Sequence, residues 1–196
     1  MYLWVKKKDV IIFDLDGTII ETDKANFLSY KCAIKQVKNI DIDIKEYQNK
    51  RFTRVDLYKF NFTQKEIKFI IDIKNKIYAS YLKDTNLYSS ILDILTKFKK
   101  RNSIIILATN SSKIRANLLL EYYNLKSFFD YIFYKEDYLN NNKFEFVCNY
   151  LNLDKDKILV FENEKKEIEN AISIGIDKNK VFNLPKGEFD ERICNI

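Results

Sequence analysis

Residues 10–18 read Val10-Ile11-Ile12-Phe13-Asp14-Leu15-Asp16-Gly17-Thr18. The apolar run at the front is short and is bounded by a turn signal, as in a buried strand. Parallel sheets present their functional side chains at the carboxyl ends of strands, so Asp14 and Asp16 should emerge there together. Two carboxylates at one sheet edge suit the binding of a divalent cation and attack on phosphorus. An Asp-rich turn without chemistry is the alternative that this stretch alone leaves open.

Further apolar runs have the length of short strands, at residues 104–107, 131–134, 158–161 and 181–182. Helical patterns lie between them, at residues 89–100, 112–123, 143–152 and 165–174. Gly175 follows the last helix as its expected C-cap. Strands that alternate with helices predict an α/β fold with a mostly parallel sheet.

Residues 23–83 interrupt this alternation and show helical patterns throughout. The segment Thr63-Gln64-Lys65-Glu66 has the spacing of a capping box. One helical face then carries the apolar and aromatic residues Ile67, Ile70, Ile71, Ile77, Tyr78 and Tyr81. We expect this insertion to form a helical cap over the carboxyl edge of the sheet, above Asp14. The predicted domains are a core of residues 1–22 and 84–196 and a cap of residues 23–83.

Composition narrows the possible chemistry. The chain has 196 residues, of which 46% are hydrophobic, and only three Gly and one Pro, which disfavours a turn-rich all-β fold. A net charge of +6 favours anionic ligands, but the lysines are scattered, so no nucleic-acid partner is predicted. The chain has no histidine, which excludes Ser-His-Asp and Cys-His catalysis and histidine metal ligands.

The three cysteines, Cys32, Cys148 and Cys194, form no C-x-x-C pair and are typical of reduced thiols in a cytoplasmic protein. Residues 1–8 lack the apolar core of a signal peptide, and the apolar run after them is too short to span a membrane. We therefore predict a cytoplasmic protein with no membrane partner, as a monomer or weak dimer.

Polar residues at two further positions suit phosphate binding. Thr109 and Asn110 follow the strand at 104–107, and strand-end hydroxyls and helix-start N–H groups bind phosphate oxygens. Lys143 begins a predicted helix, where its charge could neutralise phosphate or aspartate. The alternatives are helix capping by Ser111 or Ser112 and an ordinary solvated lysine.

Acidic and amide groups follow the strand at 158–161. Glu162 and Asn163 stand at its end and offer the oxygen ligands that Mg²⁺ prefers. An acidic helix start, favoured by the helix dipole, explains the later acidic residues but not these two.

Taken in order, these motifs resemble the haloacid dehalogenase superfamily. Residues 13–22 match its first motif, Thr109 its second, Lys143 its third and Phe161-Glu162-Asn163 its fourth. The segment through Ile174-Gly175-Ile176 resembles the β-phosphoglucomutase-like subgroup with a small helical cap. The resemblance covers about residues 9–184. It implies a Rossmann-like core and Mg²⁺-dependent phosphohydrolase activity.

The resemblance also implies a role for each residue. Asp14 would attack phosphorus and form an aspartyl-phosphate. Asp16 would protonate the leaving oxygen and later deprotonate the hydrolytic water. Thr109, Asn110 and Lys143 would bind the transferred phosphoryl group.

The implied cofactor is Mg²⁺, held by Asp14, the carbonyl of Asp16, Asn163 and Glu162. The family pattern has Asp where this chain has Asn163. A neutral amide oxygen should hold Mg²⁺ more weakly, so we expect an active enzyme with a raised metal requirement.

Two cap residues are candidates for substrate recognition. Lys74 interrupts the apolar stripe, and Lys74-Asn75-Lys76-Ile77-Tyr78 resembles a segment of β-phosphoglucomutase caps. Arg54 lies in Phe52-Thr53-Arg54-Val55-Asp56, which resembles a cap loop whose Arg contacts the distal phosphate of the substrate. A snorkelling Lys and a solvated Arg are the plainer alternatives.

The predicted function is hydrolysis of a small phosphorylated metabolite, such as a sugar or polyol phosphate. Two alternatives remain: a phosphosugar mutase, although the cap His of β-phosphoglucomutases is absent, and a catalytically weak family member that only binds.

Overall fold

The computed structural model describes residues 9–43, 45, 51–139 and 141–184. The chain divides into two compact units, one made of Met1–Ile20 with Leu87–Ile196 and the other of Glu21–Asn86. We call the first the core unit and the second the inserted unit. The chain passes between them at β2 (Ile20–Glu21) and β3 (Asn86–Leu87), which pair as a two-stranded sheet.

A five-stranded parallel sheet organises the core unit. Its strands are β1 (Val10–Phe13), β4 (Ile104–Ala108), β5 (Tyr131–Phe133), β6 (Ile158–Glu162) and β7 (Val181–Asn183), in the order β5-β4-β1-β6-β7. The sheet confirms the predicted α/β fold. In the register, Phe13 lies opposite Leu107 on one side and Phe161 on the other, so residues just beyond these strands are neighbours in space.

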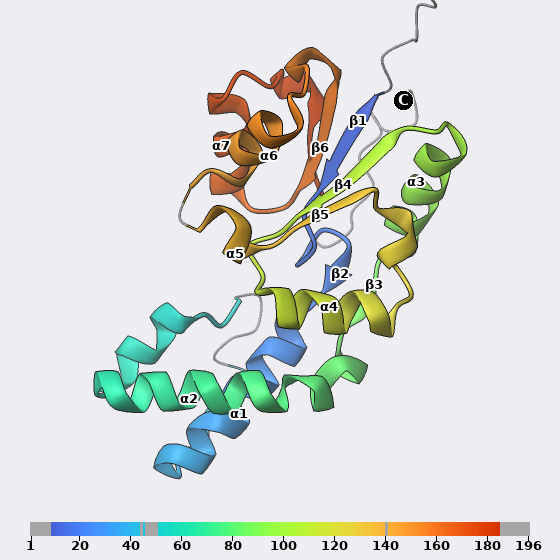
Figure 1. Cartoon of the computed structure of the whole chain (residues 1–196). Coiled ribbons are helices and arrows are strands. Elements are labelled where there is room, and N and C mark those ends of the chain that lie inside the picture. Colours follow the sequence, from blue (N-terminus) through green and yellow to red (C-terminus); the bar gives the residue numbers. More distant parts are fainter. Residues whose placement is uncertain (1–8, 44, 46–50, 140, 185–196) are drawn as a thin grey trace, which may run out of the picture. The chain divides into compact units, whose positions relative to one another are not determined.

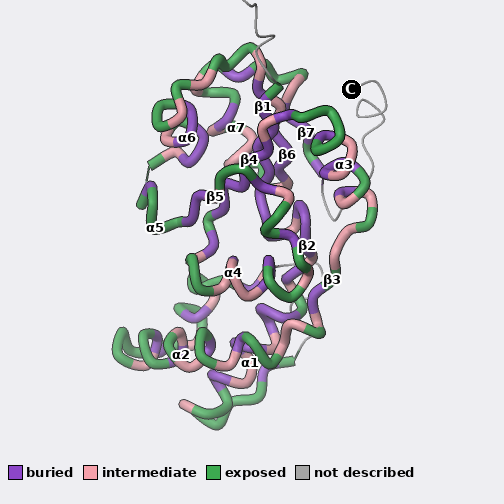
Figure 2. The backbone as a smooth tube through the Cα atoms, turned by 45° about the vertical axis from the view of Figure 1, so that its right-hand side comes forward, coloured by how far each residue is buried: buried purple, intermediate pink, exposed green. Residues whose placement is uncertain are grey.

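Helices cover both faces of this sheet (Figure 1). On one face lie α6 (Lys143–Leu151) and α7 (Lys165–Ser173), and on the other α3 (Ser89–Lys100). Val10 and Ile12 point into the cluster that contains Phe144 and Val147 of α6. Phe13, whose position alternates with that of Ile12 along the strand, stacks on Phe161 at 4.6 Å between ring centroids. The central strand is thus apolar on both faces, as parallel sheets require, and it is buried throughout (Figure 2).

The remaining elements of the core unit are short. They are α4 (Lys113–Tyr122), η4 (Lys126–Phe128), α5 (Lys135–Tyr138), η5 (Lys155–Lys157) and η6 (Lys178–Lys180). The helices and strands predicted for the core unit have boundaries within about one residue of the observed ones, as at the last turn of α7. That helix ends at Ser173 with Ile174 as its C-cap, and Gly175 stands one position further on with φ +97°, where a left-handed residue normally ends a helix.

The inserted unit is less regularly helical than predicted. It contains α1 (Asp23–Lys38), η2 (Arg54–Phe60), α2 (Gln64–Ile77) and η3 (Tyr78–Asp84). The expectation of helix throughout 23–83 is wrong, because Asn39 and Asn61 adopt left-handed φ values of 54° and 53° that end α1 and η2. The capping box at Thr63 and Glu66 is present. The α2 stripe also stops at Ile77, since Tyr78 and Tyr81 belong to η3.

The inserted unit has a core of its own, in which α1 packs against α2 around buried residues that include Phe27, Phe52 and Ile67. Cys32 and Cys148 are free thiols, and Cys194 and residues 1–8 lie outside the described residues. Within the described ranges, no helix combines the length and the apolar character needed to cross a bilayer.

Candidate active site

The polar residues that follow β1, β4 and β6 gather at one edge of the core unit. The backbone N–H of Asp14 donates to the carbonyl of Phe161 at 3.0 Å, which continues the pairing of β1 with β6 beyond the strand. Thr109 continues β4 in the same way by donating to the carbonyl of Phe133 at 3.0 Å. Parallel pairing therefore brings together side chains that are about 150 residues apart in sequence.

Lys143 lies at the centre of this cluster. Its Nζ donates to Asp14 Oδ1 at 2.8 Å and to Glu162 Oε2 at 2.7 Å. The side chain is 1% exposed, so Lys143 is not the solvated lysine of the alternative interpretation. Asn142 fixes the start of α6 by accepting from the N–H groups of Phe144 and Glu145.

The charges around Lys143 set its protonation. Burial alone lowers the pKa of its ammonium, but the carboxylates of Asp14 and Glu162 outweigh this and hold the pKa above its usual value. Lys143 is therefore a fixed positive charge at the sheet edge.

The pKa of Asp14 is raised as well, which for a carboxyl group favours the neutral form. Burial, reinforced by the charge of Glu162, raises the pKa of Asp14 to about 7, although Lys143 lowers it. Two carboxylates thus share one ammonium in a buried site. A further positive charge beside Asp14 would favour its ionised form.

Backbone N–H groups also hold the Glu162 carboxylate in place. Its Oε1 accepts from the N–H groups of Asn163 and Glu164, at 2.8 and 3.0 Å. Both oxygens of this buried carboxylate are therefore engaged, one by Lys143 and the other by the chain that leads into α7.

Asp16 has separate partners from those of Asp14. Its Oδ2 accepts from the Ser111 hydroxyl at 2.6 Å, and its Oδ1 forms an ion pair with Nη2 of Arg115. Arg115 Nη1 also donates to Ser111 Oγ at 2.8 Å, which closes a ring of three side chains. Sequence reasoning missed Arg115. The available signal was an arginine in the first turn of the predicted helix, four residues after Ser111, in a chain with five arginines.

The turn after β4 is pinned by Tyr138, which sequence reasoning also missed. Its hydroxyl donates to the carbonyl of Thr109 at 2.5 Å and contacts Asn110 Oδ1 at 3.0 Å. Thr109 is fully buried, and its Oγ1 accepts from the Ser111 N–H at 3.1 Å. Asn110 is exposed.

Gly17 and Asn163 meet closely. Gly17 has φ +84°, and a Cβ there would lie 2.4 Å from an end atom of the Asn163 amide. The side-chain amide of Asn163 matches its neighbours when its nitrogen points towards their oxygens. In this orientation the nitrogen donates to the Asp16 carbonyl and Thr18 Oγ1 at 3.1 Å and to Glu162 Oε1 at 3.2 Å. Glycine is favoured here because residues with a Cβ rarely adopt this left-handed backbone conformation.

The donor set at this edge consists of oxygen atoms. In the described ranges, Asp, Glu, Cys and His side chains alone form no metal-binding group of three or more. A divalent cation would therefore need the Asp16 carbonyl and the Asn163 amide oxygen beside the Asp14 and Glu162 carboxylates. These hard oxygens suit Mg²⁺, so the residues present fit the implied ion.

The two predicted substrate residues belong to the inserted unit. Arg54 is exposed at the start of η2. Lys74 is only 5% exposed, and its Nζ lies 5.2 Å from the ring centre of Tyr30 and 4.9 Å from that of Tyr78. The core unit thus brings together the predicted catalytic, phosphate and metal residues, while Arg54 and Lys74 occupy different surroundings within the inserted unit.

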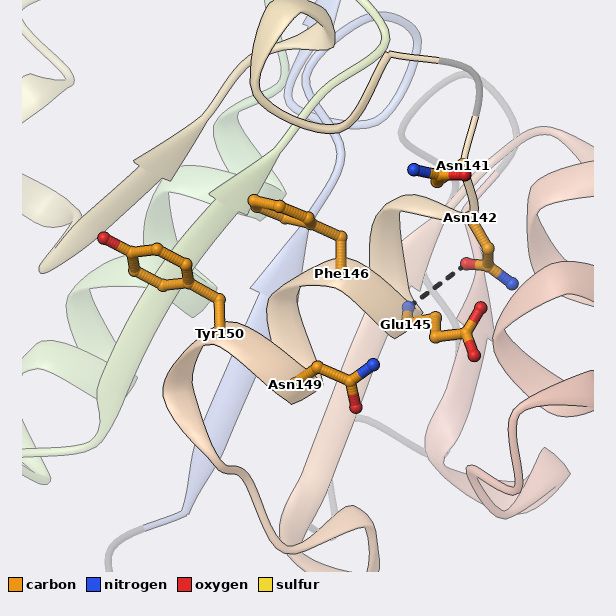
Figure 3. Close-up of a pocket in the computed structure, with 6 residues that line it drawn as sticks. All are labelled: Asn141, Asn142, Glu145, Phe146, Asn149 and Tyr150. Atoms are coloured by element: carbon orange, nitrogen blue, oxygen red, sulfur yellow. Dashed lines mark hydrogen bonds between the residues drawn. The ribbon is translucent and has the colours of Figure 1, made fainter.

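A surface cavity of about 470 Å³ lies elsewhere in the core unit, along α6 (Figure 3). Its lining contains none of the predicted site residues and consists of Asn141, Asn142, Glu145, Phe146, Asn149 and Tyr150. Asn142 is already occupied in capping α6. The predicted catalytic, phosphate-binding and metal-binding residues of the core unit therefore lie outside this cavity, near the strand ends.

The chain resembles known proteins along most of its length. A family model described as haloacid dehalogenase-like hydrolase matches residues 11–181. A phosphorylated carbohydrates phosphatase from Thermotoga maritima is 21% identical over 182 residues, covering 87% of this chain and 83% of that protein.

Solved structures share the fold. A protein from Clostridium difficile that is provisionally assigned as a phosphatase has a TM-score of 0.76 at 24% identity, covering 95% of this chain and 89% of that one. A protein from Thermotoga maritima provisionally assigned as a β-phosphoglucomutase has a TM-score of 0.63 at 20% identity, covering 95% and 90%. At these identities the likeness establishes a common fold.

Proposed function

The chain belongs to the haloacid dehalogenase-like hydrolase family, and from this membership we propose that it is a phosphatase that hydrolyses a small phosphorylated metabolite with the help of Mg²⁺. A sugar or polyol phosphate is the proposed substrate class, supported by the phosphorylated carbohydrates phosphatase among its relatives. The observation that carries the proposal is the buried Lys143 ammonium between Asp14 and Glu162.

Asp14 is the proposed nucleophile. A carboxylate oxygen attacks phosphorus, the bond from phosphorus to the ester oxygen breaks, and an aspartyl-phosphate forms. The ester oxygen leaves as an alcohol after it receives a proton from Asp16. Water then attacks the same phosphorus, gives its proton to Asp16, and displaces Asp14 with release of orthophosphate.

The surrounding groups stabilise the phosphoryl group as charge develops on it. Lys143, the Thr109 hydroxyl and Asn110 are the proposed ligands of its oxygens, and fixed donors of this kind supply a large share of catalysis. Mg²⁺ held by Asp14, the Asp16 carbonyl, Asn163 and Glu162 would add positive charge next to the phosphoryl oxygens. Lys143 neutralises part of the negative charge that two carboxylates and a phosphate bring together.

The inserted unit is the proposed specificity cap, with Arg54 and Lys74 as its substrate contacts. Cytoplasmic location, a monomeric or weakly dimeric state and the lack of nucleic-acid partners remain part of the same proposal. The free thiols of Cys32 and Cys148 agree with a reducing compartment.

A binding protein with weak catalysis is the second candidate, because Asn163 supplies no negative charge to the metal. Phosphate release from p-nitrophenyl phosphate and from a panel of sugar and polyol phosphates, with and without Mg²⁺, separates the two. Asp14→Asn should reduce turnover by roughly a thousandfold or more. Asp93→Asn, on the exposed face of α3, is the matched control. Turnover that survives in Asp14→Asn would refute the mechanism.

A further inference from the structure

The segment from the end of β5 through α5 holds the turn that follows β4 at three points. The Phe133 carbonyl accepts from the Thr109 N–H at 3.0 Å. The Lys135 N–H donates to the Ser111 carbonyl at 3.2 Å. The third point is the Tyr138 hydroxyl, which donates to the Thr109 carbonyl at 2.5 Å. Of these three bonds, the last is the one made by a side chain, so a substitution at Tyr138 can remove it.

The Tyr138 hydroxyl is well suited to be a fixed donor. Tyr138 is buried, and its ring lies 6.1 Å from that of Phe146 between centroids. Burial raises the pKa of the hydroxyl, while Lys143 opposes this shift and Asp14 adds to it. The phenol therefore keeps its proton at neutral pH, and it lies within range of the charges that form the candidate site.

The bond from Tyr138 also sets the direction of the next peptide N–H. The described peptide bonds are all trans. Because a trans peptide is planar, the Asn110 N–H points opposite to the Thr109 carbonyl oxygen. A hydroxyl that fixes this oxygen thus fixes the direction of the N–H. The same hydroxyl contacts Asn110 Oδ1 at 3.0 Å, which restrains the Asn110 side chain as well.

The Thr109 hydroxyl is oriented within the same turn. Its Oγ1 accepts from the Ser111 N–H at 3.1 Å, and a hydroxyl that accepts one bond can still donate its own proton. Phe13 of β1 lies opposite Leu107 of β4, so the turn begins close to Asp14, the proposed nucleophile. The geometry of the turn therefore decides where its proposed phosphoryl ligands point, next to the reacting atoms.

From these contacts we infer that Tyr138 is a positioning residue for phosphoryl transfer. Its hydroxyl holds the turn after β4 so that the Thr109 hydroxyl and the Asn110 N–H are already directed when the substrate binds. Tyr138 acts through this turn and not on the substrate itself. Donors fixed in advance stabilise the charge of the transition state without reorganising during the reaction. The inference rests on the proposed phosphatase function and adds to it a residue outside the predicted site.

Tyr138→Phe tests the inference, because it removes the hydroxyl and keeps the ring. With p-nitrophenyl phosphate and Mg²⁺, kcat should fall by roughly tenfold and KM should change by less than about twofold. Tyr134→Phe is the matched control, since Tyr134 is also buried and its hydroxyl donates to Asn117 of α4 at 2.9 Å, away from this turn. The control should lose similar stability and keep its kcat. Equal kcat values in the two folded variants would give Tyr138 a purely structural role and overturn the inference.

Binding of orthovanadate separates this inference from the proposed function, because it needs no turnover. Orthovanadate can adopt the five-coordinate geometry of phosphoryl transfer. Calorimetric titration with Mg²⁺ present should give a Kd about tenfold higher for Tyr138→Phe than for the wild-type protein, and an unchanged Kd for Tyr134→Phe.

The titration has three informative results. Weaker binding in Tyr138→Phe alone, without hydrolysis by the wild-type protein, would support the inference while the phosphatase mechanism fails. Equal Kd values in the two variants would refute the inference even if p-nitrophenyl phosphate is hydrolysed. A wild-type protein that neither binds orthovanadate nor hydrolyses the ester would overturn both.

Discussion

Two buried lysines lie in contrasting surroundings in the two units. Lys143 in the core unit is bonded to the carboxylates of Asp14 and Glu162. Lys74 in the inserted unit has its ammonium near the faces of Tyr30 and Tyr78. An ion pair fixes a charge at a defined point, whereas aromatic faces attract a cation more weakly and with less directional demand. The contrast separates a lysine held by two carboxylates from one packed against aromatic rings.

The largest expected effect comes from breaking the Lys143 cluster. Lys143→Gln leaves two buried carboxylates without their shared cation, which should cost about 3–5 kcal/mol of folding free energy. It should also reduce kcat by about a hundred- to a thousandfold, since a fixed donor to the phosphoryl group is lost. Denaturant unfolding and p-nitrophenyl phosphate turnover measure the two effects. Lys135→Gln, at an exposed position of α5, is the control, and equal kcat values in the two variants would contradict the assignment.

The same cluster should make stability depend on pH in an unusual direction. The pKa of Asp14 is raised from 3.8 to about 7, so the native state binds a proton more tightly than the unfolded chain. The stability that Asp14 contributes is therefore full below about pH 4 and falls as pH rises towards 7. Three pKa units correspond to about 4 kcal/mol, as an upper limit.

Asp14→Asn tests this, because an amide does not titrate. Measured in EDTA, the stability of the variant relative to the wild-type protein should rise between about pH 4 and pH 7 and then level off. Asp93→Asn provides the reference slope. A difference between variant and wild type that stays constant across this range would show that Asp14 is not perturbed.

Lys74 tests whether the inserted unit takes part in substrate binding. If it contacts the substrate, Lys74→Ala should raise KM for the preferred metabolite by roughly tenfold and leave kcat near its original value. Loss of the contacts with Tyr30 and Tyr78 should lower stability by only about 0.5–2 kcal/mol. Lys76→Ala, at an exposed position of the same helix, is the control. An unchanged KM would make Lys74 a purely structural residue.

The two units also differ in how far their sequences predict them. The core strands were predictable because short apolar runs end in polar residues, and parallel pairing places Asp14, Thr109 and Glu162 at one edge. Arg115 and Tyr138 were not, because their contacts with Asp16 and Thr109 depend on how α4 and α5 pack. In the inserted unit, Lys74 shows why helical periodicity is insufficient: the apolar stripe indicates that its side chain is buried, but not what surrounds it.

The last comparison concerns a single atom, because Asn163 has an amide nitrogen where the Asp of the family pattern has a carboxylate oxygen. Its amide nitrogen can donate to the Asp16 carbonyl and to Glu162, two groups that a cation would also use. Asn163→Asp replaces this donor by a negative oxygen, so the Mg²⁺ concentration for half-maximal activity should fall by about tenfold. The Mg²⁺-dependent rise in Tm should begin at correspondingly lower concentration. Asn149→Asp, at an exposed position of α6, adds the same charge in the same unit, and it should not move either curve. If wild-type protein is already saturated at micromolar Mg²⁺, Asn163 does not weaken the site, and its amide oxygen must serve the metal as well as a carboxylate would.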